Sequence, residues 1–478
     1  MSAWKNILLN LPEVASPTQK HLPFKEKLKW TLITLILFFV LGMVPLFGLG
    51  ENALQRFELL SIILGASFGS ILSLGIGPIV TASIVLQLLK GSGIINLKTD
   101  TKEERQKYQG IQKLTSVFFI IFEAAIYVFM GGLAPAAKYL GTETFLQLQL
   151  LLVVQLTIGG LLVMLMDEVV SKWGFGSGIS LFIAAGVSQS VFIRAFSPLQ
   201  ATGGEQAYVG QIPQMIYAIA NQDPTGALIS ASSVISTILI FAIAVYAQSM
   251  KIEIPLSFGR VRGHGIRWPL QFMYTSNIPV ILVSALLANF QLWGSLLQQW
   301  AIKSGGTIIT KISQLVGTFT DQGQATSGLL AWLTPPNIVE STITQGFVDG
   351  LLRNLPQVFA YVLFLVLGCI MFSWFWVQTS GMDAKSQANQ IMKSGLQMPG
   401  FRRDPRVLEK LLDKKIKPLT IMGAICVGLL AGLADVSGAL TNGTGLLLTV
   451  MIIYKLYEDI AKQHMMDMNP MMKKFMGG

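Results

Sequence analysis

Long apolar segments alternate with shorter polar segments along almost the whole chain. A helix rises 1.5 Å per residue, so about 20 apolar residues cross the roughly 30 Å of hydrocarbon in a bilayer. The apolar segments comprise residues 30–49, 57–90, 114–134, 144–166, 178–196, 228–249, 270–293, 352–377, 418–436 and 442–461. This pattern predicts an all-α integral membrane protein with ten transmembrane helices.

The second apolar segment, residues 57–90, is too long for one crossing and barely long enough for two. Gly75, Gly77 and Pro78 interrupt it near its middle. Proline removes a helix hydrogen bond, and glycine adopts the backbone dihedrals that a break requires. Broken backbone at membrane depth is tolerated only against protein or a water-filled cavity. We therefore predict a short re-entrant helix at about 57–68, a turn, and a second helix that starts near these glycines.

The composition and the distribution of charge agree with a membrane protein of defined orientation. The 478 residues are 52% hydrophobic and 13% charged, against about 25% charged in soluble domains. All but six of the 35 lysines and arginines lie in the N-terminal tail, in the loops after even-numbered spans, or in the C-terminal tail. Because cytoplasmic segments carry the excess of basic residues, we predict a cell-membrane protein with both termini in the cytoplasm.

The spans also contain an internal repeat that is weak in sequence but consistent in position. The second span contains "GPIV" at 77–80 and the seventh contains "IPVI" at 278–281; the fifth begins with "GSGISLFI" and the tenth with "GTGLLLTV". The repeat divides the chain into halves at residues 1–205 and 206–478. Because each half has five spans, the second is inverted, and such repeats commonly flank a transport pathway. The alternative is that glycine and proline simply recur in membrane helices.

The side chains beside the predicted helix breaks are aliphatic: Ile76, Val80, Ile179, Ile183, Ile281 and Leu448. A ring of such side chains suits a constriction that excludes water and ions by dewetting, although isoleucine in membrane helices commonly faces lipid or packs. A solute transporter would place charged or ion-coordinating groups there. The clear intramembrane acids are Glu123 and Asp435, and Asp435 lies near the end of a span.

Two predicted cytoplasmic loops are long and basic and contain glycine. One contains "SFGRVRGHGIRWP" at 257–269, and the other, residues 381–417, has nine lysines and arginines, including "GFRRDPR". Loops of this kind can reach an anionic surface such as folded RNA, which they would bind through its phosphates. The alternative partner is anionic lipid, combined with the topology signal itself.

The sequence offers no chemistry for an enzyme. It contains no phosphate-binding loop of the G-x-x-x-x-G-K-[ST] type, its two cysteines lie in apolar spans, and its three histidines are scattered. We therefore expect no metal, no cofactor and no catalytic residue, and an external source of energy. A secondary active solute transporter with inverted repeats stays open as the alternative function.

Several blocks of the sequence resemble one known family. They are "PFKEKLKWT" before the first span, "LGIGPIVTASIVLQLLKGSGII" in the second, "DEVVSKWGFGSGISLFIAAGVSQ" into the fifth, "YTSNIPVILVSALLANFQLW" in the seventh, "FWVQTSGMDAKS" after the eighth and "GALTNGTGLLLTV" at the tenth. The chain resembles the SecY-type channel subunit of the protein-conducting Sec translocon. The resemblance covers nearly the whole chain and is strongest to the archaeal branch, which is similar to the alpha subunit of the eukaryotic endoplasmic reticulum translocon.

The resemblance implies a fold and roles for particular residues. Two inverted halves of five helices, hinged between spans 5 and 6, would pass unfolded polypeptide through the aliphatic ring named above. The helix at about 57–68 would be a plug. Spans 2, 3, 7 and 8 would form a lateral gate that releases signal and transmembrane segments into lipid, with Thr81, Gln87 and Asn289 as its candidate polar residues. Arg260, Arg262, Arg402 and Arg403 would contact a docked ribosome or another cytoplasmic driver.

The resemblance also implies partners. These are the SecE-type (gamma) and small beta subunits, the ribosome with its nascent chain and ribosomal RNA, signal sequences, membrane lipid, and delivery by the signal recognition particle and its receptor. The external segment at about 294–351 is long and rich in glycine, serine and threonine. Its counterpart varies within the family, so no role is assigned to it.

Overall fold

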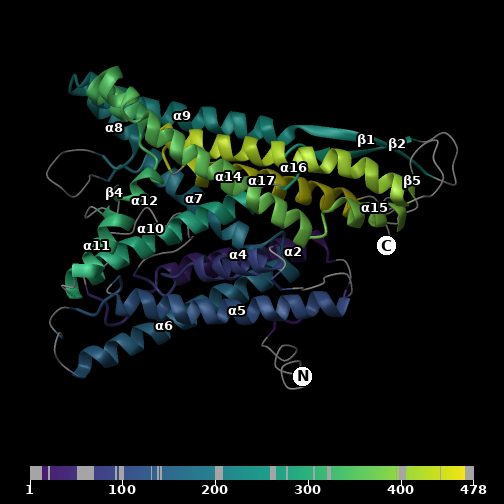
Figure 1. Ribbon diagram of the computed structural model, residues 1–478, viewed down its shortest axis with the longest axis horizontal. Coiled ribbons are helices and arrows are strands. Elements are labelled where there is room, and N and C mark those ends of the chain that lie inside the picture. The colour runs from purple at the N-terminus through teal and green to yellow at the C-terminus, as the bar shows by residue number, and fades with distance from the viewer. Residues whose placement is uncertain are drawn as a thin grey trace.

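The chain is mostly helical in the computed structural model (Figure 1). The structure describes residues 13–19, 22–50, 69–91, 94–95, 102–130, 132–136, 139, 143–199, 208–258, 265–275, 278–304, 307–319, 325–393, 396–397, 405–441 and 443–468.

Each predicted span corresponds to a helix in the described part of the chain. In the first half these are α2 (Phe24–Gly42), α4 (Gly77–Gly91), α5 (Lys102–Phe129), α6 (Glu143–Trp173) and α7 (Gly178–Phe196). In the second half they are α9 (Pro224–Ser249), α10 (Ile278–Ser304), α14 (Leu355–Thr379), α16 (Pro405–Val436) and α17 (Gly443–Met468), with the short α8 (Gln211–Ala220) before α9. Among the described residues, seven helices are long and apolar enough to cross a membrane, and α4 is a shorter apolar helix. Several apolar membrane helices are therefore confirmed, while the exact number of ten stays a prediction.

Several helices extend beyond the limits that hydropathy predicts. Helix α5 begins at Lys102 instead of 114, and α16 begins at Pro405 instead of 418. The extra turns are polar and charged, and such residues form helices readily in water. Hydropathy marks the part of a helix that suits hydrocarbon, and the backbone continues past it.

The predicted basic loop between α9 and α10 contains β-strands. Strands β1 (Lys251–Phe258) and β2 (Gly265–Gln271) form an antiparallel hairpin, and β5 (Leu396–Gln397) adds to the free edge of β1. The predicted seventh span began at residue 270, but its first two residues belong to β2 and α10 starts at Ile278. Pro255 and Pro269 each lack a backbone donor, and apolar and polar residues alternate in "KIEIPLSF", which favours a strand.

The long segment between α10 and α14 is also folded. It contains α11 (Thr307–Val316), the pair β3 (Thr318–Phe319) and β4 (Ala325–Ser327), α12 (Leu329–Trp332), α13 (Ile338–Gly346) and a π-helical turn, η4 (Phe347–Leu352). Gly294 lets α12 and β3 approach α10, because a β-carbon there would lie 2.5 Å from Leu330 and 2.9 Å from the Phe319 ring.

The helices pack lengthwise in two groups with α7 and α10 between them (Figure 1). Helices α2, α4, α5 and α6 lie on one side, and α9, α14, α16 and α17 on the other. The largest core cluster draws on α4, α7, α10, α14 and α17. Large apolar side chains cover the outside as well; on α9 alone these include Ile235, Ile238 and Phe241, each more than half exposed. Outward faces of this kind suit lipid rather than water.

Candidate functional site

The glycine–proline break in the second segment lies where the sequence predicts it. Residues 71–76 form consecutive turns and α4 begins at Gly77. Gly75 has a φ of 53°, in the left-handed region that glycine adopts without strain. Pro78 is the second residue of α4, where its missing donor leaves no helix hydrogen bond unmade. The predicted re-entrant helix at about 57–68 lies outside the described residues.

The six aliphatic residues of the predicted ring belong to one buried apolar cluster or pack against it. Five of them are at most 8% exposed and belong to the largest core cluster: Ile76, Val80, Ile183, Ile281 and Leu448. Ile179 is half-buried and packs against the same cluster. They come from the turn before α4 and from α4, α7, α10 and α17. Both halves of the chain thus contribute side chains to the same apolar cluster.

Two of these helices begin in the same way, on an aspartate from the helix before. The carboxylate of Asp167 on α6 accepts a hydrogen bond from the Ile179 amide, at 2.9 Å. The carboxylate of Asp435 on α16 accepts one from the Thr444 amide, at 2.8 Å. Ile179 and Thr444 are each the second residue of their helix, α7 and α17. Each aspartate satisfies one of the amides that every helix leaves free at its start.

The glycine that opens each of these helices is required by close packing. A β-carbon on Gly178 would lie 2.5 Å from the Asp167 α-carbon, and one on Gly443 would overlap the backbone of Ala434. The last glycine of "GSG" and the first glycine of "GTG" therefore have the same role: each brings a helix start against the preceding helix.

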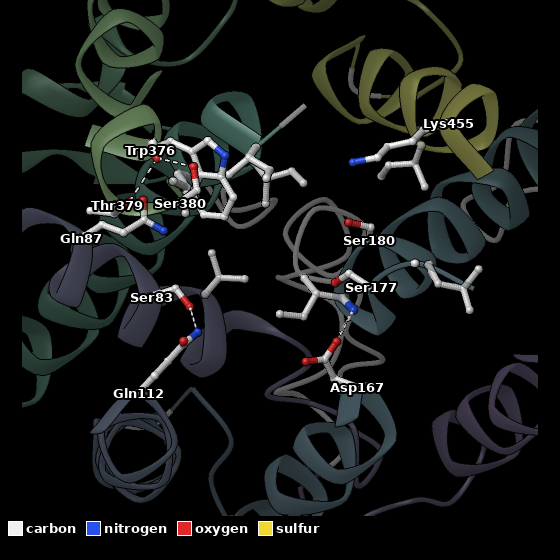
Figure 2. Close-up of a pocket in the computed structure, with 18 of the residues that line it drawn as sticks. Ser83, Gln87, Gln112, Asp167, Ser177, Ser180, Trp376, Thr379, Ser380 and Lys455 are labelled. Atoms are coloured by element: carbon white, nitrogen blue, oxygen red, sulfur yellow. Dashed lines mark hydrogen bonds between the residues drawn. The ribbon is translucent and has the colours of Figure 1, made fainter. Parts of the chain in front are cut away.

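A cavity of about 440 Å³ lies beside the aliphatic cluster (Figure 2). Val80, Ile179 and Ile281 from the predicted ring contribute to its wall. Its polar lining is drawn from several helices and includes Ser83, Gln87, Gln112, Asp167, Ser177, Thr379, Ser380 and Lys455. Figure 2 shows these side chains around an open centre, with Ser83, Gln87 and Gln112 facing Ser177 and Lys455 across it. Three residues of the predicted ring thus line a cavity whose wall is partly polar.

Helices α4 and α5 meet α10 and α14 along a line that we call the seam. Helices α4 and α5 contact each other on one side of the seam, and α10 and α14 contact each other on the other side. The Gln112 amide on α5 donates to the Ser83 hydroxyl on α4 at 2.9 Å, and Gly368 on α14 leaves room for Val283 on α10.

One hydrogen bond crosses the middle of the seam: the Asn289 amide on α10 donates to the Thr81 hydroxyl on α4, at 2.9 Å. Both side chains are buried.

Of the three predicted gate residues, the structure brings Thr81 and Asn289 into contact, and Gln87 lies apart from that hydrogen bond. Gln87 is 4% exposed, lines the cavity, and its carbonyl oxygen accepts no hydrogen bond among the described residues. Sequence reasoning did not assign Glu123 to this place. Its carboxylate is buried beside the Thr81 hydroxyl. An acid in the middle of an apolar span was the signal that could have placed it here.

The basic loops form one folded unit at the end of the molecule where α14 ends (Figure 1). A separate apolar core joins β1 and β2 to α15 (Ala384–Lys393) and the start of α16; it includes Ile254, Leu270, Ala388 and Leu412. Lys251 on β1 pairs with Glu458 on α17 at 2.7 Å, and this hydrogen bond raises the pKa of Lys251 above its ordinary value. The four predicted contact residues lie outside the described residues: Arg260, Arg262, Arg402 and Arg403.

Comparison with known proteins identifies relatives over the whole chain. A family model described as SecY matches residues 70–457. The chain is similar to the protein translocase subunit SecY of Methanothermobacter thermautotrophicus, with 43% identity covering 98% of this chain and 97% of the relative.

Two solved structures extend the likeness to three dimensions. One is described as the structure of a protein conducting channel, with a TM-score of 0.79, 37% identity and coverage of 96% of this chain and 97% of the other. The second is described as Sec61 in the canine ribosome-channel complex from the endoplasmic reticulum, with a TM-score of 0.76 and the same identity and coverage.

Proposed function

The chain belongs to the SecY family of protein translocase subunits, and from this premise we propose how its residues conduct polypeptide. As a member of the family it is the pore-forming subunit of a protein translocation channel, a multi-pass membrane protein and not an enzyme. The alternative of a secondary active solute transporter finds no support among these relatives.

The aliphatic ring is the constriction through which polypeptide passes. The observation that carries this proposal is that six aliphatic residues beside the helix breaks converge from both halves next to a partly polar cavity. Such a ring binds no ion and offers no hydrogen bond to a passing chain, so it favours no particular sequence. An apolar constriction also resists wetting, which limits the leak of ions between substrates.

Site-specific photocrosslinking at Ile76 and Ile281 tests the ring. The protein is reconstituted with its small subunits and given a stalled ribosome–nascent chain that bears a signal sequence. We expect both positions to crosslink to the translocating segment. Ile238, which is 63% exposed on α9, is the control and should crosslink to lipid only. A chain that crosses the membrane without touching either ring position would place the pore elsewhere.

Ten spans in two inverted halves of five are the architecture that we propose around this ring. The paired helix starts support it. Asp167 with Gly178 in the first half and Asp435 with Gly443 in the second occupy corresponding places. The amide that each aspartate accepts from belongs to the second residue of the fifth and tenth proposed spans. Shared side-chain contacts of this detail favour a true repeat over chance recurrence of glycine.

The seam is the lateral gate through which apolar segments leave for lipid. Thr81 and Asn289 bond across it, and Glu123 is buried beside them. Polar groups on the lipid side of a membrane helix are costly, so these residues need the closed seam around them. A hydrophobic segment that enters the seam supplies apolar surface and parts the two helix pairs.

The cytoplasmic unit is the docking site for the ribosome or another driver. Strands β1 and β5 are paired at Ser257–Gln397 and Phe258–Leu396, so the chain leaves both strands at neighbouring positions. Arg260 is two residues beyond β1 and Arg402 five beyond β5, within about 7 and 17 Å of chain. Basic residues tethered to one small sheet can bind the phosphates of folded RNA.

The remaining partners and the orientation follow from family membership as proposals. They are the SecE-type and small beta subunits, and targeting by the signal recognition particle and its receptor. The bias of lysine and arginine supports a cell-membrane location with both termini in the cytoplasm.

A further inference from the structure

Lys90 lies in the last turn of α4 and reaches across the seam. Its ammonium group lies 3.3 Å from the backbone carbonyl oxygen of Thr379 on α14, to which it donates a hydrogen bond. It also lies 5.1 Å from the centre of the Tyr108 ring on α5. Helices α4 and α5 form one side of the seam and α14 the other, so Lys90 is held on one side and bonded to the opposite one.

The acceptor suits a cation. Thr379 is the last residue of α14, and the last four carbonyls of a helix have no partner within it. The partial negative charge at a helix C-terminus adds to the attraction. Tyr108 contributes a second attraction, because a cation is drawn to the face of an aromatic ring within about 6 Å. The Tyr108 ring thereby keeps the Lys90 ammonium group near the seam instead of leaving it in water.

The seam is closed by different interactions at three levels. At the external end, Tyr127 on α5 and Leu292 and Leu296 on α10 belong to one buried apolar cluster. In the middle, Asn289 and Thr81 share a neutral hydrogen bond. At the end where α14 finishes, the described contact is the charged one from Lys90. The cavity that includes Tyr108, Thr379 and Ser380 in its lining lies at this same end, so a segment that enters from there meets Lys90 before the other two levels.

We propose that Lys90 is a specificity-determining residue of the seam: its ammonium group, held by Tyr108, ties α4 to the end of α14 and raises the hydrophobicity that a targeting segment needs to open the gate. This inference rests on the proposed function of the seam as a lateral gate. It assigns the residue that a segment must displace first.

The size of the effect follows from the strength of such contacts. A charged hydrogen bond contributes less when solvent reaches it, as at this partly buried lysine, than when it is fully buried. We expect loss of the contact to raise the ratio of open to closed gates about fivefold. One leucine favours membrane insertion of a segment about twofold. The least hydrophobic signal that the channel accepts should therefore need about two fewer leucines.

The first test is translocation of a series of substrates whose signal sequences differ only in their number of leucines. The complete channel is compared with its Lys90→Met, Lys90→Arg and Lys107→Met variants. Lys107 lies on α5 near Tyr108, and Lys107→Met removes the same charge without touching the bond to Thr379. We expect Lys90→Met to accept the weaker signals, and Lys90→Arg and Lys107→Met to behave as the unchanged channel.

The second test measures the seam directly. Spin labels at Gln106→Cys on α5 and Gln378→Cys on α14 occupy exposed positions on its two sides, in a background with Cys369→Ala and Cys426→Ala. Lys90→Met should increase the population of the longer distance about fivefold, and Lys90→Arg should not. This distance measurement reports on the Lys90 contact even if a variant has lost transport.

The outcomes distinguish a failure of the proposed Lys90 contact, which we call the latch, from a failure of the proposed gate. If the unchanged channel moves substrates with strong signals but Lys90→Met shifts neither the threshold nor the distance, the latch is wrong and the gate stands. An equal shift in Lys107→Met would also overturn it, because general charge and not the bond to Thr379 would be responsible. If the unchanged channel moves no substrate and its labels never separate, the proposed gate fails first.

Discussion

At position 159, a glycine allows the turn before α4 to rest directly on α6. A β-carbon there would overlap the carbonyl oxygen of Ile71, and one on Gly160 beside it would lie 2.6 Å from the Ile120 side chain on α5. The contact at Gly159 is with backbone, which cannot move away as the end of a side chain can. The glycine pair in "TIGGLL" therefore sets how closely the broken segment approaches its neighbours, and so where Ile76 and Val80 lie.

Replacement of Gly159 by alanine tests this close approach. We expect a loss of about 2 kcal/mol of stability, because overpacking forces backbone to shift, together with greater ion conductance as the ring loses its support. The control is Gly445→Ala, whose β-carbon would meet only a Val187 methyl group at 3.3 Å. Thermal unfolding in nanodiscs and single-channel conductance measure the two effects. Equal behaviour of the two variants would mean that the Ile71 contact does not position the ring.

At the scale of elements, an aspartate side chain caps the start of α7 and another caps the start of α17, the two helices that contribute Ile179, Ile183 and Leu448 to the ring. Asp435 accepts from the Thr444 amide and, at 2.5 Å, from the Tyr361 hydroxyl on α14. Asp167 accepts from the Ile179 amide. These aspartates act as helix caps inside a membrane protein, so the intramembrane acid Asp435 has a structural partner for its charge or its proton.

Removal of the two caps should have unequal effects. Asp167→Ala should cost about 1 kcal/mol, the value of one cap. Asp435→Ala should cost about 3 kcal/mol, because it also removes the acceptor of two side-chain hydroxyls, those of Tyr361 and Thr444. Asp223→Ala, at the exposed start of α9, supplies the reference for a cap outside the centre. Thermal unfolding of the three variants measures the order, and a cost at Asp435 no larger than that at Asp223 would contradict it.

At the scale of the whole molecule, two loops separated by over a hundred residues fold as one body. Helix α15 and the start of α16 pack on the β1–β2 hairpin through a core of their own, and Lys251 ties that hairpin to α17 through Glu458. The surface that we propose for the ribosome is thereby joined to the last helix of the chain's second half.

A cavity in this small core should loosen both loops together. Leu412 is 1% exposed within it, and Leu412→Ala should cost about 3 kcal/mol. Hydrogen exchange should then rise in β1 and β2 as well as in α15, although the substitution touches neither strand's sequence. Leu433→Ala, on an exposed face of the same helix, should leave that exchange unchanged. Faster exchange confined to α16 would show that the loops are independent.

The sequence by itself determined the apolar helices, the break at Gly75–Pro78 and the family, because hydropathy and backbone preference act over a few neighbouring residues. The resemblance to the family also grouped Thr81 with Asn289, which the structure brings into contact. The hairpin was missed because two basic stretches that contain glycine were interpreted as loops, and strand pairing is decided by contacts far along the chain.

Only the tertiary structure decided which side chains meet. Hydropathy marks Glu123 as unusual but does not say that it lies beside Thr81, and nothing in "QLLKGSG" indicates that Lys90 reaches the end of α14. The shared role of Asp167 and Asp435 was hidden for the same reason. Each depends on the distance and angle between packed helices, and these are fixed by close packing over the whole molecule, such as the glycine contacts at 159 and 368.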